Sequence, residues 1–240
     1  MYPPSVIRDE VLVTLSEQEF EVYLLRDHEG AKRILRNYND ALVFINIDDG
    51  QNEAEWESWI RSVMGDPATK NVGIGILSYN APDALKKKYL MEIGIPCGFI
   101  HLKMGLEQGT RILLETLRAN EAKGRRKYVR ANCAHDHLSS VNLYYNGNRF
   151  LGDIRDISAV GFSCFFENDP GMPKNALIDN IQMKLRGSLL TVEAIVFGKR
   201  EEAGTVYVML YTQRVESMAR AKIRKYIQTT LQTFIESELK

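Results

Sequence analysis

Two arginines, followed by an acidic residue, a hydroxyl and a glycine, are the residues of this sequence that could bind an anionic ligand. Arg126 and Arg130 stand four residues apart, and Asp156, Ser158 and Gly161 follow in the spacing D-x-S-x-x-G. A guanidinium group presents a planar fork that can grip a phosphate, or the O6 and N7 edge of guanine, through two hydrogen bonds. The pattern therefore predicts a site for a compact, phosphate-bearing ligand.

The arginine pair lies in the strongest local imbalance of charge in the chain. Residues 122–135 include five basic residues and no acidic one. These basic residues are Lys123, Arg125, Arg126, Lys127 and Arg130. A run of charge is often only a solvated linker. Here Gly124 and the lack of apolar residues between it and Tyr128 favour a flexible strap that closes on an anion.

Asp156 and Ser158 come at the end of an expected strand. Side chains two residues apart point to the same face of a strand, where a carboxylate and a hydroxyl could accept from and donate to a guanine edge. Gly161 could supply a turn with positive φ or let a ligand approach the backbone closely. An Asx or ST turn that closes a hairpin would explain the same residues without a ligand, and it is the strap upstream that favours a site.

The bulk composition limits the classes of protein that fit. The chain has 240 residues, 45% of them hydrophobic and 26% charged, which is typical of a soluble globular protein. Lys+Arg and Asp+Glu are both 31, so a polymer of nucleic acid is not the expected partner. The sequence has no apolar run long enough for a membrane helix and no signal-peptide pattern at its start. The three cysteines are few and scattered, which predicts reduced thiols and a cytoplasmic location.

Residues 1–120 alternate apolar strand patterns with amphipathic helix patterns. This alternation predicts a parallel sheet with helices on both faces, hence an α/β sandwich. The expected strands are 10–15, 20–26, 41–47, 72–78 and 97–102, and the expected helices are 29–37, 53–64, 82–93 and 106–119.

Residues 131–212 contain many short strand patterns separated by turns, including a turn at 198–204. Such spacing predicts an antiparallel barrel or sandwich. The expected strands are 141–145, 149–156, 161–166, 183–185, 190–197 and 205–211. A long helix should close the chain, because apolar residues recur every four positions and can pack on the barrel. They are Val215, Ala219, Ile223, Ile227, Leu231 and Ile235, joined by Met218, Phe234 and Leu239.

Residues 121–240 are expected to form the second domain, and roughly residues 121–238 resemble the PilZ family, which binds the bacterial second messenger cyclic di-GMP. The resemblance rests on R-x-x-x-R at Arg126 and Arg130, and on D-x-S-x-x-G at 156–161. It implies a six-stranded antiparallel β-barrel with a long C-terminal helix. It also implies that Arg126, Arg130, Asp156, Ser158 and Gly161 bind the ligand. Arg125, directly before the first motif, implies two intercalated cyclic di-GMP molecules per chain.

Residues 1–120 resemble a receiver domain of two-component systems, or a flavodoxin-like relative. Asp48 and Asp49 stand where a receiver has its phosphoacceptor, Ser78 where it has Ser or Thr, and Lys103 where it has its lysine. The acidic pair after the first strand is missing from residues 12–18, so magnesium would lack ligands. The resemblance therefore implies a receiver-like domain that does not accept a phosphoryl group.

Three alternatives remain open. Cys133, His135 and His137 alternate along a possible strand and could hold zinc, although three side chains on one straight strand do not converge. The chain could also be a phosphorylation-controlled response regulator, or a small barrel that binds single-stranded nucleic acid. The interpretation favoured overall is a cytoplasmic bacterial cyclic di-GMP receptor, not an enzyme, with no cofactor or metal. It would act on an unidentified protein effector, with motility as the regulated process.

Overall fold

The computed structural model describes residues 1–240 except 6, 39, 123–125, 203 and 240. The chain divides into two compact units. One comprises Met1–Arg125 together with Ile235–Lys240, and the other comprises Arg126–Phe234. Each unit is described below by itself.

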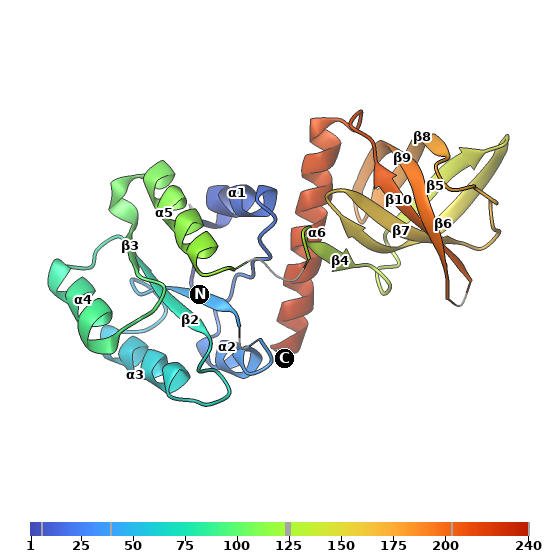
Figure 1. Ribbon diagram of the computed structural model, residues 1–240. Coiled ribbons are helices and arrows are strands. Elements are labelled where there is room, and N and C mark those ends of the chain that lie inside the picture. Colours follow the sequence, from blue (N-terminus) through green and yellow to red (C-terminus); the bar gives the residue numbers. More distant parts are fainter. Residues whose placement is uncertain (6, 39, 123–125, 203, 240) are drawn as a thin grey trace. The chain divides into compact units, whose positions relative to one another are not determined.

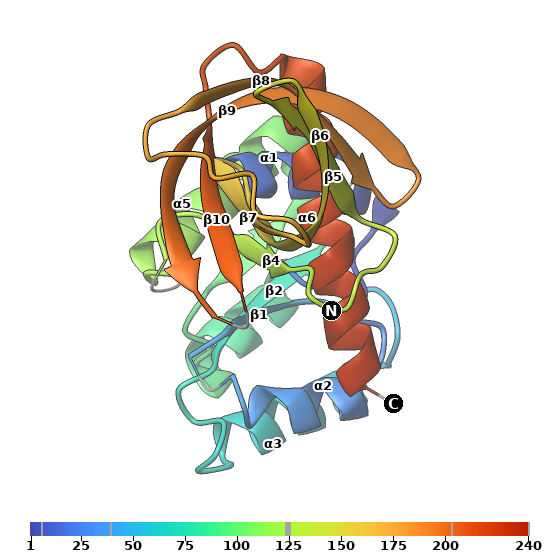
Figure 2. The ribbon, with the colours of Figure 1, turned by 90° about the vertical axis from the view of Figure 1, so that its right-hand side faces the viewer.

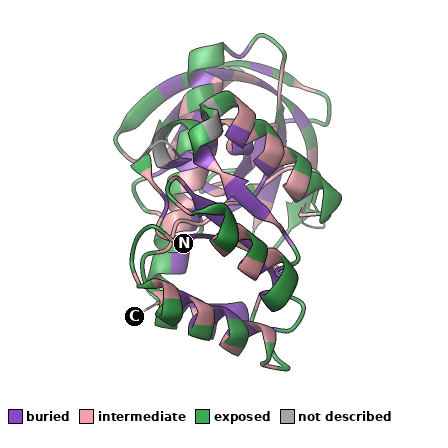
Figure 3. Ribbon diagram, turned by 90° about the vertical axis from the view of Figure 1, so that its left-hand side faces the viewer, coloured by how far each residue is buried: buried purple, intermediate pink, exposed green. Residues whose placement is uncertain are grey.

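The N-terminal unit is built on a parallel sheet with strand order β1-β2-β3. These strands are β1 (Leu42–Asn46), β2 (Gly73–Ser78) and β3 (Phe99–His101). The helices are α1 (Leu12–Glu17), α2 (His28–Leu35), α3 (Glu53–Met64), α4 (Asp83–Lys87) and α5 (Leu106–Ala119), with π-helical turns at Ile7–Val11 and Lys88–Ile93 and a 3-10 turn at Leu102–Met104. Every residue of β2 is buried, as expected for the central strand (Figure 3).

Helices flank both faces of this sheet (Figure 1), and a buried cluster lies on each face. Ile74 and Ile76 of β2 join a cluster that includes Trp56 and Trp59 of α3, whereas Leu77 joins a second cluster with Leu113 of α5. Successive strand residues point to opposite faces, so α2 and α3 cover one face and α1 and α5 the other.

Two of the five strands predicted for this unit are wrong. Residues 10–15 are helical, because Val11 and Leu15 are buried four residues apart whereas Val13 between them is 57% exposed, which is helical spacing. Residues 20–26 carry no strand ladder within the described chain. The flavodoxin-like sandwich is therefore not confirmed, since the described residues give only a three-stranded parallel sheet.

The C-terminal unit is an antiparallel barrel (Figure 2). The strands are β4 (Arg130–Asn132), β5 (Ser140–Tyr145), β6 (Asn148–Ser158), β7 (Gly161–Phe166), β8 (Leu177–Leu185), β9 (Ser188–Glu201) and β10 (Thr205–Tyr211). The ladder runs β6-β5-β8-β9-β10-β7, and β6 also pairs with β7. Six strands thus close the barrel, as the sequence predicted. The short β4 pairs with the last residues of β6, beyond the part of β6 that pairs with β5.

Helix α6 (Ser217–Glu238) follows the barrel. The predicted apolar stripe is confirmed from Val215 to Leu231, where each member is buried. Met218 and Phe234 were expected to join it, but they are 68% and 51% exposed. They lie one position beside members of the four-residue series, so the helix turns them away from its buried stripe. None of the described helices combines the length and apolarity that a membrane crossing needs.

Candidate ligand-binding site

The end of strand β6 brings the two sequence motifs together. Arg130 of β4 is the register partner of Ser158 in β6, and Ser158 pairs on its other side with Gly161 of β7. Strand β4 was not predicted, since three residues are too few for a two-residue periodicity to show. Its pattern exposes Arg130 and buries Ala131, so the arginine points outward while the strand is anchored by the alanine.

The carboxylate of Asp156 is the centre of the site. Its Oδ1 lies 3.3 Å from Nη1 of Arg130, and its Oδ2 accepts a hydrogen bond of 2.6 Å from the Oγ of Ser163. Nη2 of Arg200 lies 3.5 Å from the same Oδ2. The Asp156 side chain is 22% exposed, against 43% for Arg130 and 47% for Arg200. One partly buried carboxylate therefore orients two guanidinium groups that both still face solvent.

Ser158 and Gly161 close the hairpin between β6 and β7. Ser158 is 4% exposed, and its Oγ donates to the carbonyl oxygen of Gly161 at 3.1 Å. Gly161 does not adopt the positive φ considered from the sequence. Its missing side chain makes room for strand β10 instead, because an added Cβ would lie 2.2 Å from the carbonyl oxygen of Met209. Ser158 and Gly161 therefore fix the backbone of the hairpin next to Asp156.

The strap is described only in part. Arg126 is exposed and lies in a bend that ends just before β4. Lys127 in the same bend places its Nζ 5.4 Å from the ring centroid of Tyr128. Arg125 and Gly124 lie outside the described residues, so a role for either stays a prediction.

Arg200 and Ser163 complete the site and were not identified from the sequence. The turn expected at 198–204 begins later, because β9 continues to Glu201 and pairs Arg200 with Val206 of β10. The two-residue alternation of β9 was visible through Phe197, but Gly198 interrupts it. Ser163 carried no signal at all in the sequence.

The zinc alternative is not supported. Cys133 is buried, whereas His135 and His137 are exposed in turns rather than on a strand. Burial raises the pKa of the Cys133 thiol to about 11, which disfavours the thiolate that zinc binds. Across the described parts of the chain, no group of three His, Cys, Asp or Glu residues could hold a metal ion.

The receiver-like positions of the N-terminal unit are partly brought together. Asp48 is exposed after β1, and its carboxylate accepts from the Oγ of Ser78 at 2.7 Å and from the backbone N–H of Tyr79 at 2.6 Å. Lys103 lies in the 3-10 turn after β3 and is exposed. Residues 12–18, where a receiver has its acidic pair, form helix α1 and the residue after it. The ligands for a catalytic magnesium ion are thus not supplied there.

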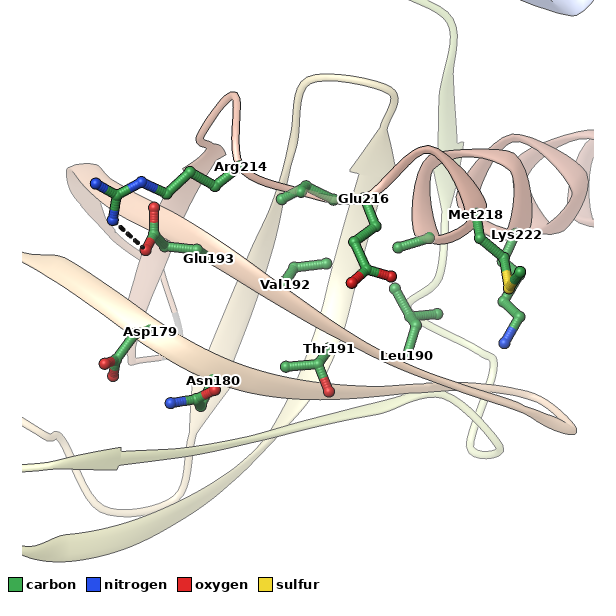
Figure 4. A pocket seen from close by; sticks show the side chains of 12 residues that line it. Asp179, Asn180, Leu190, Thr191, Val192, Glu193, Arg214, Glu216, Met218 and Lys222 are labelled. Atoms are coloured by element: carbon green, nitrogen blue, oxygen red, sulfur yellow. Dashed lines mark hydrogen bonds and ion pairs between the residues drawn. The ribbon is translucent and has the colours of Figure 1, made fainter.

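A separate groove of about 420 Å³ lies between strands β8 and β9 and the start of α6 (Figure 4). Its walls mix apolar side chains with charged ones, and Arg214 and Glu193 form an ion pair of 3.4 Å across one end. The remaining lining residues are Asp179, Asn180, Leu190, Thr191, Val192, Val215, Glu216, Met218, Ala219 and Lys222. The groove shares no residue with the site around Asp156.

No protein-family model matches the sequence, and no curated protein matches it either. Among solved structures, the chain is similar to the PilZ domain of YcgR from Escherichia coli with cyclic di-GMP, at 12% identity and a TM-score of 0.41, over 48% of this chain and 97% of that one. It is also similar to the complex of MrkH from K. pneumonia with cyclic di-GMP, at 20% identity, a TM-score of 0.39, and 48% and 54% of the two chains.

A third similar structure is MotI/DgrA, an inhibitor of motility from Bacillus subtilis, at 15% identity and a TM-score of 0.36, over 43% and 50% of the two chains. The matched part spans about half the length of MrkH and of MotI/DgrA. PilZ is the family that the sequence motifs resemble.

Proposed function

We propose that this chain is a receptor for cyclic di-GMP and not an enzyme. The observation that carries the proposal is the row of Arg130, Ser158 and Gly161 across β4, β6 and β7, with Asp156 paired to Arg130 beside it. Arg130 and Asp156, which have 25 residues between them in the sequence, come together as a pair that is partly open to solvent. Its residue types match a ligand that presents both phosphates and guanines.

The chemistry of each residue suits one part of that ligand. Arg126 and Arg130 would bind a phosphate, or the O6 and N7 edge of guanine, with their planar forks. Asp156 would accept hydrogen bonds from the guanine N–H groups, which no other nucleobase edge offers in the same arrangement. Ser158 and Gly161 would hold the backbone at the floor of the site. Arg125, the third arginine of the strap, would allow a second intercalated molecule, giving two ligands per chain.

The output would be a change in domain arrangement. In this proposal the receiver-like domain at 1–120 is linked by the arginine strap to the barrel domain at 121–240. Ligand that orders the strap would shift the equilibrium between arrangements, because only the ordered strap binds it well. The changed arrangement would expose a surface to a protein effector in the cytoplasm, with motility as the controlled process. Ligand should then suppress proteolytic cleavage at residues 123–130, and undiminished cleavage at saturation would refute the closure of the strap.

Isothermal titration with cyclic di-GMP tests the central proposal. The unsubstituted chain should bind with a ratio near two, and Arg125→Leu should bind one molecule. Arg126→Ala or Arg130→Ala should each cost ~1–3 kcal/mol of binding, the worth of a bidentate contact to guanine. Asp156→Ala should reduce the preference for cyclic di-GMP over cyclic di-AMP.

Arg149→Ala is the matched control, since Arg149 is an exposed arginine near the other end of β6. It should leave the affinity unchanged. A titration that gives no heat with cyclic di-GMP, while another nucleotide binds, would overturn the proposal. A ratio of one for the unsubstituted chain would remove only the second ligand.

The two other functions considered from the sequence are less well supported. A phosphorylation-controlled regulator needs an acidic metal pocket, and α1 occupies the segment where its acidic pair would lie. A barrel for single-stranded nucleic acid needs exposed aromatic rings among basic residues. Tyr144 is exposed on the barrel, but the basic strap lies before a different strand.

A further inference from the structure

Strand β9 places a second arginine, Arg200, beside the carboxylate of Asp156. It runs to Glu201, and its pairing with β10 fixes Arg200 opposite Val206. From there Nη2 of Arg200 lies 3.5 Å from Oδ2 of Asp156, and its Nε lies 3.7 Å from Oε1 of Glu202. Arg200 therefore belongs to the surface on which the two sequence motifs meet, although it lies about 40 residues beyond the second.

The contacts around Asp156 leave donor groups unused. Arg130 approaches Oδ1, while Ser163 and Arg200 share Oδ2. A guanidinium group carries five N–H donors, and these ion pairs engage only a part of each fork. Arg130 and Arg200 are 43% and 47% exposed, so a large part of each side chain remains open to solvent.

The balance of charge also favours an anionic ligand at this surface. Asp156 is one carboxylate between two guanidinium groups, and Glu202 is 53% exposed, which weakens its screened attraction for Arg200. Arg126 and Lys127 add two exposed cations to the approach from the strap. The surface keeps an excess of positive charge that a phosphate group can neutralise.

We propose that Arg200 is a ligand-binding residue of this site and that it donates to a phosphate of the bound nucleotide. The inference rests on the proposed binding of cyclic di-GMP and adds a residue that neither motif contains. Asp156 holds the guanidinium in place before the ligand arrives, so its donors are already aimed at the site. The ligand is thus bound by two segments that are far apart in the sequence, through Arg130 of β4 and Arg200 of β9.

Titration of three variants with cyclic di-GMP tests this role. Arg200→Met keeps the length of the side chain and removes the charge, and it should weaken binding about tenfold or more, the range for a hydrogen bond to a charged group. Arg200→Lys keeps the charge but lacks the planar fork, so its affinity should lie between those of Arg200→Met and the unsubstituted chain. Arg214→Met is the matched control, because Arg214 is also an exposed arginine in an ion pair, with the less exposed Glu193 at 3.4 Å, and the affinity of this variant should stay within twofold of that of the unsubstituted chain.

Salt dependence separates binding to phosphate from mere positioning of Asp156. Loss of a cation that contacts phosphate makes the affinity less sensitive to ionic strength. Arg200→Met should therefore show a shallower slope of log Kd against log salt. Ser163→Ala loosens Asp156 but removes no charge, so its slope should match that of the unsubstituted chain. Thermal unfolding without ligand checks that each variant is folded.

Failure of this inference differs from failure of the proposed function. If the unsubstituted chain does not bind cyclic di-GMP, the proposed function itself is wrong. If it binds and Arg200→Met binds equally well, the role of Arg200 is overturned while the receptor stands. Tighter binding by Arg200→Met would also overturn it, since Arg200 would then compete with the ligand for Asp156.

Discussion

The hydroxyl of Tyr226 is expected to stabilise the barrel unit by about 2 kcal/mol, the middle of the range for a hydrogen bond to a charged group. Tyr226 lies on α6 and is 6% exposed. Its hydroxyl donates to Oδ2 of Asp136 at 2.7 Å. The same oxygen accepts from Oγ of Ser139 at 2.9 Å and from Nε of Arg186 at 3.1 Å. This network joins the helix to the loop before β5 and to the turn after β8.

The magnitude follows from what each substitution leaves behind. Tyr226→Phe keeps the ring and its packing and removes one donor, so Asp136 retains Ser139 and Arg186. Asp136→Ala removes the acceptor of three side-chain donors and of the Leu138 N–H, and the Asp136 side chain is only 11% exposed. Breaking a buried charge network in this way costs roughly 3–5 kcal/mol. The partial exposure of Arg186, 34%, places the expected loss at the lower end of that range.

Acid should reduce the contribution of Tyr226. Burial by itself would raise the pKa of Asp136, but hydrogen bonds from Tyr226, Ser139, the Leu138 N–H and Arg186 outweigh it, and the pKa lies below its ordinary value. A carboxyl whose pKa is lower in the folded state stabilises the protein above its unfolded pKa, near 3.9, and the stabilisation is lost as pH falls through the folded value. The difference between the unsubstituted chain and Tyr226→Phe should therefore shrink below about pH 4.

Urea unfolding followed by circular dichroism measures these losses. Both tryptophans, Trp56 and Trp59, lie in the N-terminal unit, so their fluorescence follows the unfolding of that unit separately. The urea midpoint measured by fluorescence should therefore be the same for the variants and the unsubstituted chain. Tyr144→Phe is the matched control, because Tyr144 is 62% exposed on β5. A loss below about 0.5 kcal/mol for Tyr226→Phe, the usual size of a surface substitution, would refute the reasoning. An equal loss for Tyr144→Phe would do the same.

Two further predictions concern a close approach in the barrel and the receiver-like positions. Gly161→Ala should destabilise the barrel unit by about 1–3 kcal/mol even without ligand, because its Cβ would lie 2.2 Å from the carbonyl oxygen of Met209. Gly187→Ala, whose Cβ would meet nothing within 4 Å, is the control in the same unfolding assay. Acetyl phosphate should leave Asp48 and Asp49 unmodified by intact-mass spectrometry, because the magnesium pocket is incomplete; stoichiometric phosphate on either would contradict this.

The sequence predicted the barrel better than the sheet of the N-terminal unit, for a physical reason. Strands of the barrel alternate buried and exposed residues, as β9 does from Leu190 to Phe197, and a period of two is visible without neighbours. The segment around Val11 and Leu15 offers apolar residues at spacings of both two and four. In the fold, Val11 and Leu15 are buried in a cluster that includes Leu113 and Leu117 of α5, and these residues lie about 100 positions away in the sequence.

The residues of the candidate site could be named from the sequence, but their partners could not. A β-bulge at Arg155 shifts the register of β6 against β7, so that Ile154 pairs with Cys164 and Asp156 pairs with Ser163. Without the extra residue, Asp156 would pair with Phe162 instead, and a slip of one residue exchanges the two faces of a strand. The hydrogen bond from Ser163 to Asp156 depends on that bulge.

The position of Arg200 depends on a longer chain of registers. It is set by the pairing of β9 with β10, of β10 with β7, and of β7 with β6. Each pairing is non-local, and no motif of a few residues encodes it. A motif therefore identifies those members of a site that are close in sequence. Residues such as Arg200, which the closure of the barrel brings to Asp156, become visible only in the structure.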